Sequence, residues 1–137
     1  MQFLVDTNVF LDFLLHRDSQ SDDANLFFIK SRMLNNPIFI TSMTLRDIEY
    51  VAARLLHSKE KAKKIQILAY QMCQKVIGIS ASDAIEALYS DGRDYEDSLI
   101  IEAAKTSLVD AIITNNKKDF NHANIPVFTP KEINGYL

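Results

Sequence analysis

The sequence contains one cysteine, no tryptophan, three glycines and three prolines among its 137 residues. Cys73 cannot close an intrachain disulfide and has no second cysteine with which to form a thiolate zinc site, so a reducing compartment is expected. A hydrophobic fraction of 47% with 24% charged residues is typical of a globular chain rather than a disordered or fibrous one. These features predict a single domain spanning residues 1–137, with a core of its own.

Long hydrophobic runs are also missing. The apolar residues 1–15 are interrupted by Asp6 and Asp12, and they lack the cationic start and cleavage site of a signal peptide. No run approaches the roughly 20 apolar residues that a membrane-spanning helix needs. We therefore expect a cytoplasmic protein without membrane contact. The net charge of −3 disfavours a passive nucleic-acid binder, yet it is compatible with an enzyme that gathers carboxylates at one point.

Short apolar runs alternate with helical patterns along the whole chain. Strands are predicted at residues 2–6, 38–41, 76–80 and 111–114, with a fifth at 126–129 on an edge where its proline is tolerated. Helical patterns occupy the intervening segments, and residues 115–121 are predicted to form a polar loop. This alternation predicts an α/β fold: a three-layer α/β/α arrangement with a central, mainly parallel sheet of four to five strands.

Three acids occupy comparable places in this pattern. Asp6 ends the first predicted strand, and Glu49 and Asp97 lie near the starts of two later helices. Because the carboxyl ends of parallel strands share one edge of the sheet, these acids can converge there. Convergent carboxylates repel one another unless a cation holds them, and oxygen ligands without His or Cys favour Mg²⁺ or Mn²⁺ over zinc. The pattern points to phosphoryl transfer to water.

Four segments resemble, in their order, the motifs of PIN domains: LVDTNVFLD (4–12), TLRDIEYV (44–51), DYEDSLIIEAA (94–104) and DAIITNNKKDF (110–120). The resemblance runs from residue 2 to about residue 130. Within this superfamily the sequence is similar to the toxin nucleases of VapBC toxin–antitoxin pairs (VapC-type ribonucleases) and to related stand-alone bacterial PIN proteins. The resemblance implies an endoribonuclease that uses Mg²⁺ or Mn²⁺ to hydrolyse RNA phosphodiester bonds, with tRNA as a candidate substrate.

The resemblance also implies roles for the acids. Asp6, Glu49 and Asp97 would be the catalytic residues. Asp6 and Asp97 would hold the metal, and Glu49 would orient or deprotonate the attacking water and is a further candidate ligand. Two simpler interpretations stand beside these: Asp6 as an ordinary helix N-cap, and Glu49 as a solvated residue paired with a nearby arginine.

Polar residues complete the implied site. Asn8, Thr114 and Asn116 would position the substrate. Many PIN domains carry Asp where this chain has Asn116, so one negative charge of the four-acid pattern is missing. Asp119, three residues further on, and Asp94, one helical turn before Asp97, are candidate metal ligands that could supply it. A site weaker than a four-acid one is expected.

Two other function classes compete with the nuclease. A non-catalytic PIN-like module that binds RNA or acts as a scaffold is the alternative that Asn116 keeps open. A phosphatase of the haloacid dehalogenase type is disfavoured, because that class needs a second Asp two residues after its nucleophile and this chain has Asn8 there.

Some apolar and basic residues are candidates for contacts with a partner. Leu11, Leu14, Phe27 and Phe28 give more apolar surface than one small sheet needs, which is compatible with a homodimer or with a groove for an antitoxin protein. Two further sets of residues are either RNA contacts or ordinary structural residues, namely the lysines at 59, 61, 63 and 64 and the tyrosines Tyr70, Tyr89 and Tyr95.

Overall fold

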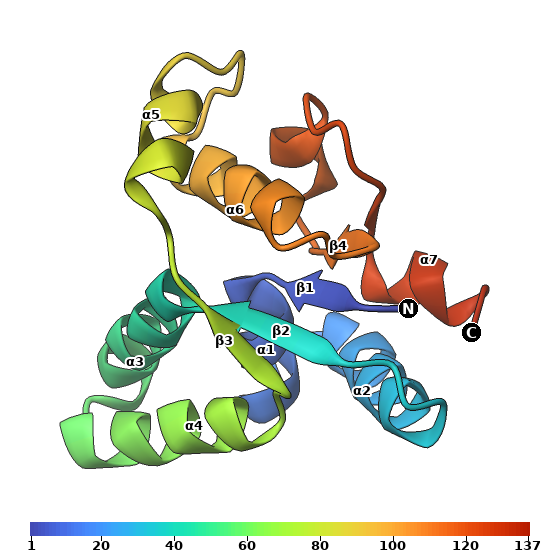
Figure 1. Ribbon diagram of the computed structural model, residues 1–137. Coiled ribbons are helices and arrows are strands. Elements are labelled where there is room, and N and C mark those ends of the chain that lie inside the picture. The colour runs from blue at the N-terminus through green and yellow to red at the C-terminus, as the bar shows by residue number, and fades with distance from the viewer.

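The computed structural model describes all residues, 1–137, and a five-stranded parallel sheet forms its centre (Figure 1). The strands, in the spatial order β3-β2-β1-β4-β5, are β1 (Phe3–Val5), β2 (Ile38–Thr41), β3 (Lys75–Ile77), β4 (Ala111–Ile113) and β5 (Val127–Phe128). Every neighbouring pair is parallel. The predicted α/β fold with its mainly parallel sheet is confirmed, and the proline-preceded strand β5 lies at an edge.

Helices form the connections from β1 to β2, from β2 to β3 and from β3 to β4. In chain order these helices are α1 (Thr7–Leu14), α2 (Gln20–Met33), α3 (Ser42–Leu56), α4 (Lys59–Gln71), α5 (Ala81–Leu88) and α6 (Tyr95–Thr106), and a last helix, α7 (Pro130–Asn134), follows β5. A short 3-10 helix, η1 (Lys117–Phe120), occupies the segment predicted as a polar loop. None of the helices combines the length and the apolar character needed to cross a membrane.

The central strands are buried on both faces. Phe3 and Val5 of β1 belong to one hydrophobic cluster, and Leu4 between them belongs to the other. Strands β2 and β4 alternate in the same way. Since successive side chains of a strand point to opposite faces, a strand covered on both sides must be apolar throughout. This explains the uninterrupted runs FLV and AII.

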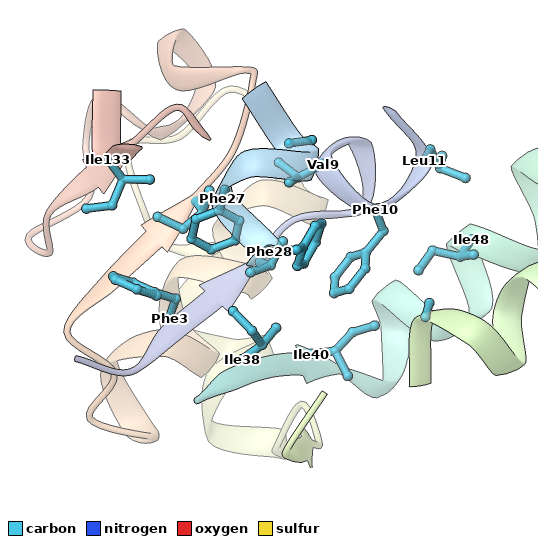
Figure 2. Packing of buried hydrophobic residues seen from close by; sticks show 14 of the residues in the cluster. Phe3, Val9, Phe10, Leu11, Phe27, Phe28, Ile38, Ile40, Ile48 and Ile133 are labelled. Carbon is cyan, nitrogen blue, oxygen red and sulfur yellow. The ribbon is translucent and has the colours of Figure 1, made fainter. Parts of the chain in front are cut away.

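The larger cluster lies between the sheet and helices α1, α2, α3, α4 and α7. Figure 2 shows Phe27 and Phe28 of α2 gathered with Phe10 of α1 over the side chains of β1 and β2. The rings of Phe27 and Phe3 lie 5.6 Å apart in an edge-to-face arrangement, and those of Phe28 and Phe10 lie 5.4 Å apart. Aromatic pairs at these separations add to the free energy gained from burial alone.

The assignment of apolar surface from the sequence needs correction here. Leu11, Phe27 and Phe28 are core residues, and Leu14 packs against the same cluster. Leu11, Phe27 and Phe28 therefore offer almost no free surface for a partner, and Leu14 is only partly exposed. In contrast, Tyr70, Tyr89 and Tyr95 are exposed rather than part of the core.

The smaller cluster covers the opposite face of the sheet, where α6 packs (Figure 1). The loop between α5 and α6 approaches this helix closely at Gly92. A Cβ atom on residue 92 would overlap the Ser98 hydroxyl and the His122 ring. Ser90, in the same loop, donates a hydrogen bond to that hydroxyl at 3.0 Å. Glycine therefore allows the loop leading to Asp94 to lie against α6.

The order of the strands defines where a ligand site is expected. The chain runs outward from β1 to β2 and β3, and then crosses to the other side of β1 to form β4 and β5. Connections from β1 and β4 thus leave the sheet in opposite directions. A crevice forms beyond the carboxyl ends of two such strands, and ligands of open α/β sheets bind there.

Helices α5 and α6 are joined by the buried carboxylate of Asp83, whose residue is 4% exposed. It accepts hydrogen bonds from the Thr106 hydroxyl at 2.7 Å and from the Ser80 backbone N–H at 3.1 Å. Burial alone would raise the pKa of Asp83, but the hydrogen bonds from Thr106 and Ser80 hold it below 3.8.

We expect Asp83→Ala to lower the free energy of unfolding by about 1–3 kcal/mol, because it removes a helix cap and leaves the Thr106 hydroxyl without its acceptor. Urea unfolding at about pH 7 measures this loss. A pKa lowered by folding contributes stability above its unfolded value, and the contribution disappears as the pH falls through the folded value. The difference between wild type and variant should therefore shrink below about pH 4. A difference that stays constant with pH would contradict this role of the charge.

Candidate active site

A cleft of about 420 Å³ opens at the expected edge of the sheet. Its wall includes Asp6, which follows β1, Asn116, which follows β4, and residues from α3 and α6. Acidic side chains predominate over the two arginines of the lining. The charged residues of the lining are Asp6, Asp47, Asp94, Glu96, Asp97, Arg17 and Arg46.

Asp6 is the most firmly held of these acids. It caps α1, and its Oδ1 accepts a hydrogen bond from the Thr7 backbone N–H at 2.8 Å. Its Oδ2 accepts from the Thr114 hydroxyl at 2.8 Å and from the Asn8 amide at 3.3 Å. Burial raises the pKa of Asp6 in spite of these bonds. Asp6 is therefore both a helix cap and a buried acid of the cleft.

Asp97 is partly buried in the first turn of α6. Its burial, together with the negative charges of Asp6, Asp94, Asp119 and Glu96, raises the pKa of this carboxyl to about 8. Asp94 caps the same helix by accepting a hydrogen bond from the Asp97 backbone N–H at 3.1 Å. The structure thus brings Asp6, Asp94 and Asp97 to one cleft, as expected, at an electrostatic cost to the protein.

Asn116 and Asp119 lie together at the fourth corner. The Asn116 backbone N–H donates to the Thr114 hydroxyl at 3.0 Å, the same hydroxyl that donates to Asp6. The Asn116 side-chain amide donates to the carboxylate of Asp119. Asp119 does not line the cleft itself, but its charge acts on Asp97. The Asp119 carboxylate therefore lies next to Asn116, the position at which many PIN domains were expected to carry an Asp.

A second set of hydrogen bonds links α1 to the segment after β4. Asn8 accepts a hydrogen bond from the Asn115 backbone N–H at 3.1 Å. The Asn115 amide donates to Asp12 at 2.5 Å, and Asp12, which is buried, forms an ion pair with Arg17 at 3.1 Å. These contacts fix Asn8 against Asn115, the residue before Asn116, and so join the two sides of the cleft.

The structure does not bring Glu49 to the cleft; Asp47 lies there instead. Thr44, Ile48 and Ala52 are the buried residues of α3 and define the face that packs on the core. At about 100° per residue, positions 47 and 49 fall on opposite flanks of that face, roughly 200° apart. The predicted convergence of Glu49 with Asp6 and Asp97 therefore needs correction.

Asp47 was missed from the sequence, although a signal for it was present. Spacings of four residues among Thr44, Ile48 and Ala52 predict the buried face of the helix, and only one of the two neighbouring acids can then face the cleft. Asp47 forms an ion pair with Arg46 at 3.0 Å, and its charge contributes to the raised pKa of Asp6. Asp47 is thus one of the five acids that line the cleft.

The acids of the cleft offer donors for a divalent cation without forming a complete site by themselves. No group of three or more His, Cys, Asp or Glu side chains is arranged to hold a metal ion. The acids of the cleft present only oxygen donors, and the raised pKa values of Asp6 and Asp97 mark carboxylates that lack a compensating positive charge. Mg²⁺ is usually held by one or two carboxylates with several waters, which is the kind of site these residues can form.

A family model described as PIN domain matches residues 2–118 of the chain. Three solved structures resemble it over nearly their whole length. A toxin–antitoxin complex from Klebsiella pneumoniae shares 27% identity over 93% of this chain and 96% of that chain, with a TM-score of 0.63. VapBC2 from Rickettsia felis, bound to a DNA fragment from its promoter, shares 22% identity over 93% and 97%, with a TM-score of 0.66.

VapC20 from Mycobacterium tuberculosis, a toxin that cleaves the sarcin–ricin loop, shares 10% identity over 90% of this chain and 98% of that chain, with a TM-score of 0.68. These two comparisons below 25% identity concern the fold alone. No sequence among curated proteins matches this chain.

We expect Asp97→Asn to stabilise the metal-free protein, because the amide removes a charge that burial and neighbouring acids disfavour. A gain of about 1 kcal/mol corresponds to a rise in Tm of roughly 3 °C, measurable by thermal unfolding in EDTA. Since the folded pKa of about 8 exceeds the unfolded value, the wild type loses stability as the pH rises between 3.8 and about 8. The advantage of the variant should therefore grow over that range. A lower Tm for Asp97→Asn than for wild type would contradict the electrostatic cost.

Proposed function

Because this chain belongs to the PIN-domain family, we propose that it is an endoribonuclease that uses Mg²⁺ or Mn²⁺ to hydrolyse phosphodiester bonds in RNA. The observation that carries the proposal is the acidic cleft beyond β1 and β4, where Asp6 and Asp97 have raised pKa values and every acidic donor is an oxygen. Carboxylates placed this way are suited to a cation and to the phosphate that it activates.

Asp6 and Asp97 would hold the metal. Thr114 and Asn8 fix the Asp6 carboxylate through its Oδ2 and so set its direction before substrate arrives. When bound, the cation would neutralise these acids and supply a Lewis acid for the phosphate. Phosphoryl transfer depends mainly on positioning and on the stabilisation of charge. The rigidly held carboxylate of Asp6 would therefore be the main contribution of the protein to catalysis.

Asp47 would take the role expected of Glu49, orienting the attacking water and accepting its proton. Its ion pair with Arg46 keeps the carboxylate on the cleft side of α3. Asn116 would bind a phosphate oxygen or a water, with Asp119 holding its amide in place. Asp94 is a further candidate ligand, because it lines the cleft one helical turn from Asp97.

The pair Asp47 and Glu49 gives a matched test of this assignment. Both acids are on α3, and the isosteric changes Asp47→Asn and Glu49→Gln remove the same charge. We expect Asp47→Asn to reduce the rate of RNA cleavage roughly 10²–10⁴-fold, because a base is lost, while Glu49→Gln retains the wild-type rate. Cleavage of total RNA in Mn²⁺ by protein freed of contaminating nucleases measures both.

Several outcomes would reject parts of the proposal. Wild-type protein that binds RNA but does not cleave it in Mg²⁺ or Mn²⁺ would favour the non-catalytic module. Cleavage that persists unchanged in EDTA, or in Asp97→Asn, would reject the metal-dependent mechanism. Loss of activity in Glu49→Gln with full activity in Asp47→Asn would reverse the roles of the two acids.

We also propose that an antitoxin protein binds this chain. The structural relatives include toxin–antitoxin complexes, and α2 exposes Leu26, Ile29 and Met33. Spacings of three and four residues place these side chains on one helix face, and Ile29 borders a cavity of about 520 Å³. An apolar face of this kind suits an amphipathic partner helix. Homodimer formation stays a prediction made from the apolar residues of the sequence.

A short reading frame for a DNA-binding protein beside the gene would identify the candidate antitoxin. We expect its product to copurify with the chain and to inhibit RNA cleavage. Ile29→Asp should weaken this complex at least tenfold, because a charge would have to be buried against the partner, while leaving cleavage by the free protein unchanged. Copurification unaffected by Ile29→Asp would show that the partner binds elsewhere.

A further inference from the structure

Two arginines and a tyrosine form a strip along the exposed side of α3. Arg46, Tyr50 and Arg54 are spaced by four residues, so they follow one another on the same helix face. Arg46 and Tyr50 line the acidic cleft, and Arg54 lies one turn further along the helix. The strip therefore begins at the acids and leads away from them.

Tyr50 holds both arginines. The Arg46 guanidinium carbon lies 4.9 Å from the centre of the Tyr50 ring, and that of Arg54 lies 5.6 Å from it. Arg54 also donates a hydrogen bond to the Tyr50 hydroxyl at 2.9 Å. Tyr50 is 45% exposed, so it contributes little to the core. Contacts of this type reduce the freedom of a flexible arginine and leave its planar group preoriented.

The charge of Arg54 is not balanced within the protein. Arg46 forms its ion pair with Asp47, and the other ion pairs of the chain involve Arg17, Lys64, Lys105 and Lys117. Arg54 has no carboxylate within ion-pair distance. A strand of RNA entering the cleft meets at least five acids there, so a cation beside them is needed to hold its phosphates.

The lysines at the start of α4 are a weaker candidate for this role. They are exposed, none of them lines the cleft, and Lys64 is offset by Glu60 at 4.0 Å. A solvated helix face explains them without a ligand. The α3 strip differs because it borders the acids and because an aromatic ring fixes its arginines.

We propose that Arg54 binds an RNA phosphate flanking the scissile one, and that Tyr50 is the positioning residue that orients its guanidinium. The inference rests on the proposed nuclease function and names how that site holds its substrate. Arg54 is four residues from Tyr50, or roughly 6 Å along the helix axis, which places it beside rather than within the cleft. A guanidinium matches two phosphate oxygens with parallel hydrogen bonds. The charge of Arg46 is neutralised by Asp47, and its guanidinium packs against the Tyr50 ring, which helps to hold that ring in place.

Binding of a labelled single-stranded oligoribonucleotide tests this, using Asp97→Asn protein in Mg²⁺ so that the probe is not cleaved. We expect Arg54→Met to raise Kd roughly tenfold and to reduce the slope of log Kd against log salt by about 0.7, the value for one phosphate contact on a single strand. Tyr50→Phe should raise Kd about threefold without changing the slope, because only the orienting hydrogen bond is lost.

Arg32→Met is the matched control. Arg32 is an exposed arginine of α2 that lines the other cavity, so the change in net charge is the same while the cleft is untouched. We expect its Kd and salt slope to equal those of the parent protein. In the cleaving protein, Arg54→Met should raise KM with kcat nearly unchanged, since the contact is to substrate outside the reacting atoms.

The outcomes separate this inference from the nuclease proposal. Equal effects of Arg54→Met and Arg32→Met on Kd would overturn the proposed role of Arg54, because they would reflect net charge alone. The absence of RNA binding by the parent protein would overturn it as well. RNA binding that depends on Arg54 in a protein that never cleaves would support the strip and reject the nuclease. A Tyr50→Phe variant with the salt slope of Arg54→Met would reject the positioning role of Tyr50.

Discussion

The buried carboxylate of Asp6 is the interaction on which the other parts of the site depend. One of its oxygens caps α1, and the other accepts from Thr114 at the end of β4, so this single group ties together a strand end, a helix start and the neighbouring strand. Burying an acid is unfavourable unless hydrogen bonds or a cation compensate it. Here the hydrogen bonds compensate only in part, since the pKa of Asp6 remains raised. The fold thus holds a charge that is most stable when a further positive charge is present.

Much of the fold could be predicted from the sequence because the sheet is covered on both sides. Double coverage requires continuous apolar runs, and these are distinct from the amphipathic helices between them. Placement of Asp6 and Asp97 at one edge followed from the parallel arrangement alone. The prediction of exposed apolar residues was wrong for Phe27 and Phe28. Both are buried in the core, where α2 packs against β1 through the pair of Phe27 and Phe3. Composition cannot show how much surface a helix pair covers.

The choice between Asp47 and Glu49 shows a limit of a different kind. A motif identifies the helix that carries an acid, whereas the rotation of that helix on the sheet decides which acid faces the cleft. A shift of two residues turns a side chain by roughly 200°, so the assignment depends on knowing the buried face. A role for Tyr50 could not be predicted from the sequence for the same reason: its position beside the cleft, like that of Asp47, depends on the rotation of the helix. Residues whose function depends on which way their side chain faces are the hardest to find in a sequence.

The close approach at Gly92 has a consequence for how this chain can diverge. Any larger residue there must displace both Ser98 and His122, and Ser98 directly follows Asp97 in the sequence. A substitution at position 92 would therefore be transmitted to the acidic edge unless positions 98 and 122 became smaller at the same time. Among descendants of this sequence, the three positions should change together or not at all, so the evolutionary freedom of this loop is limited by its contact with the helix that carries Asp97.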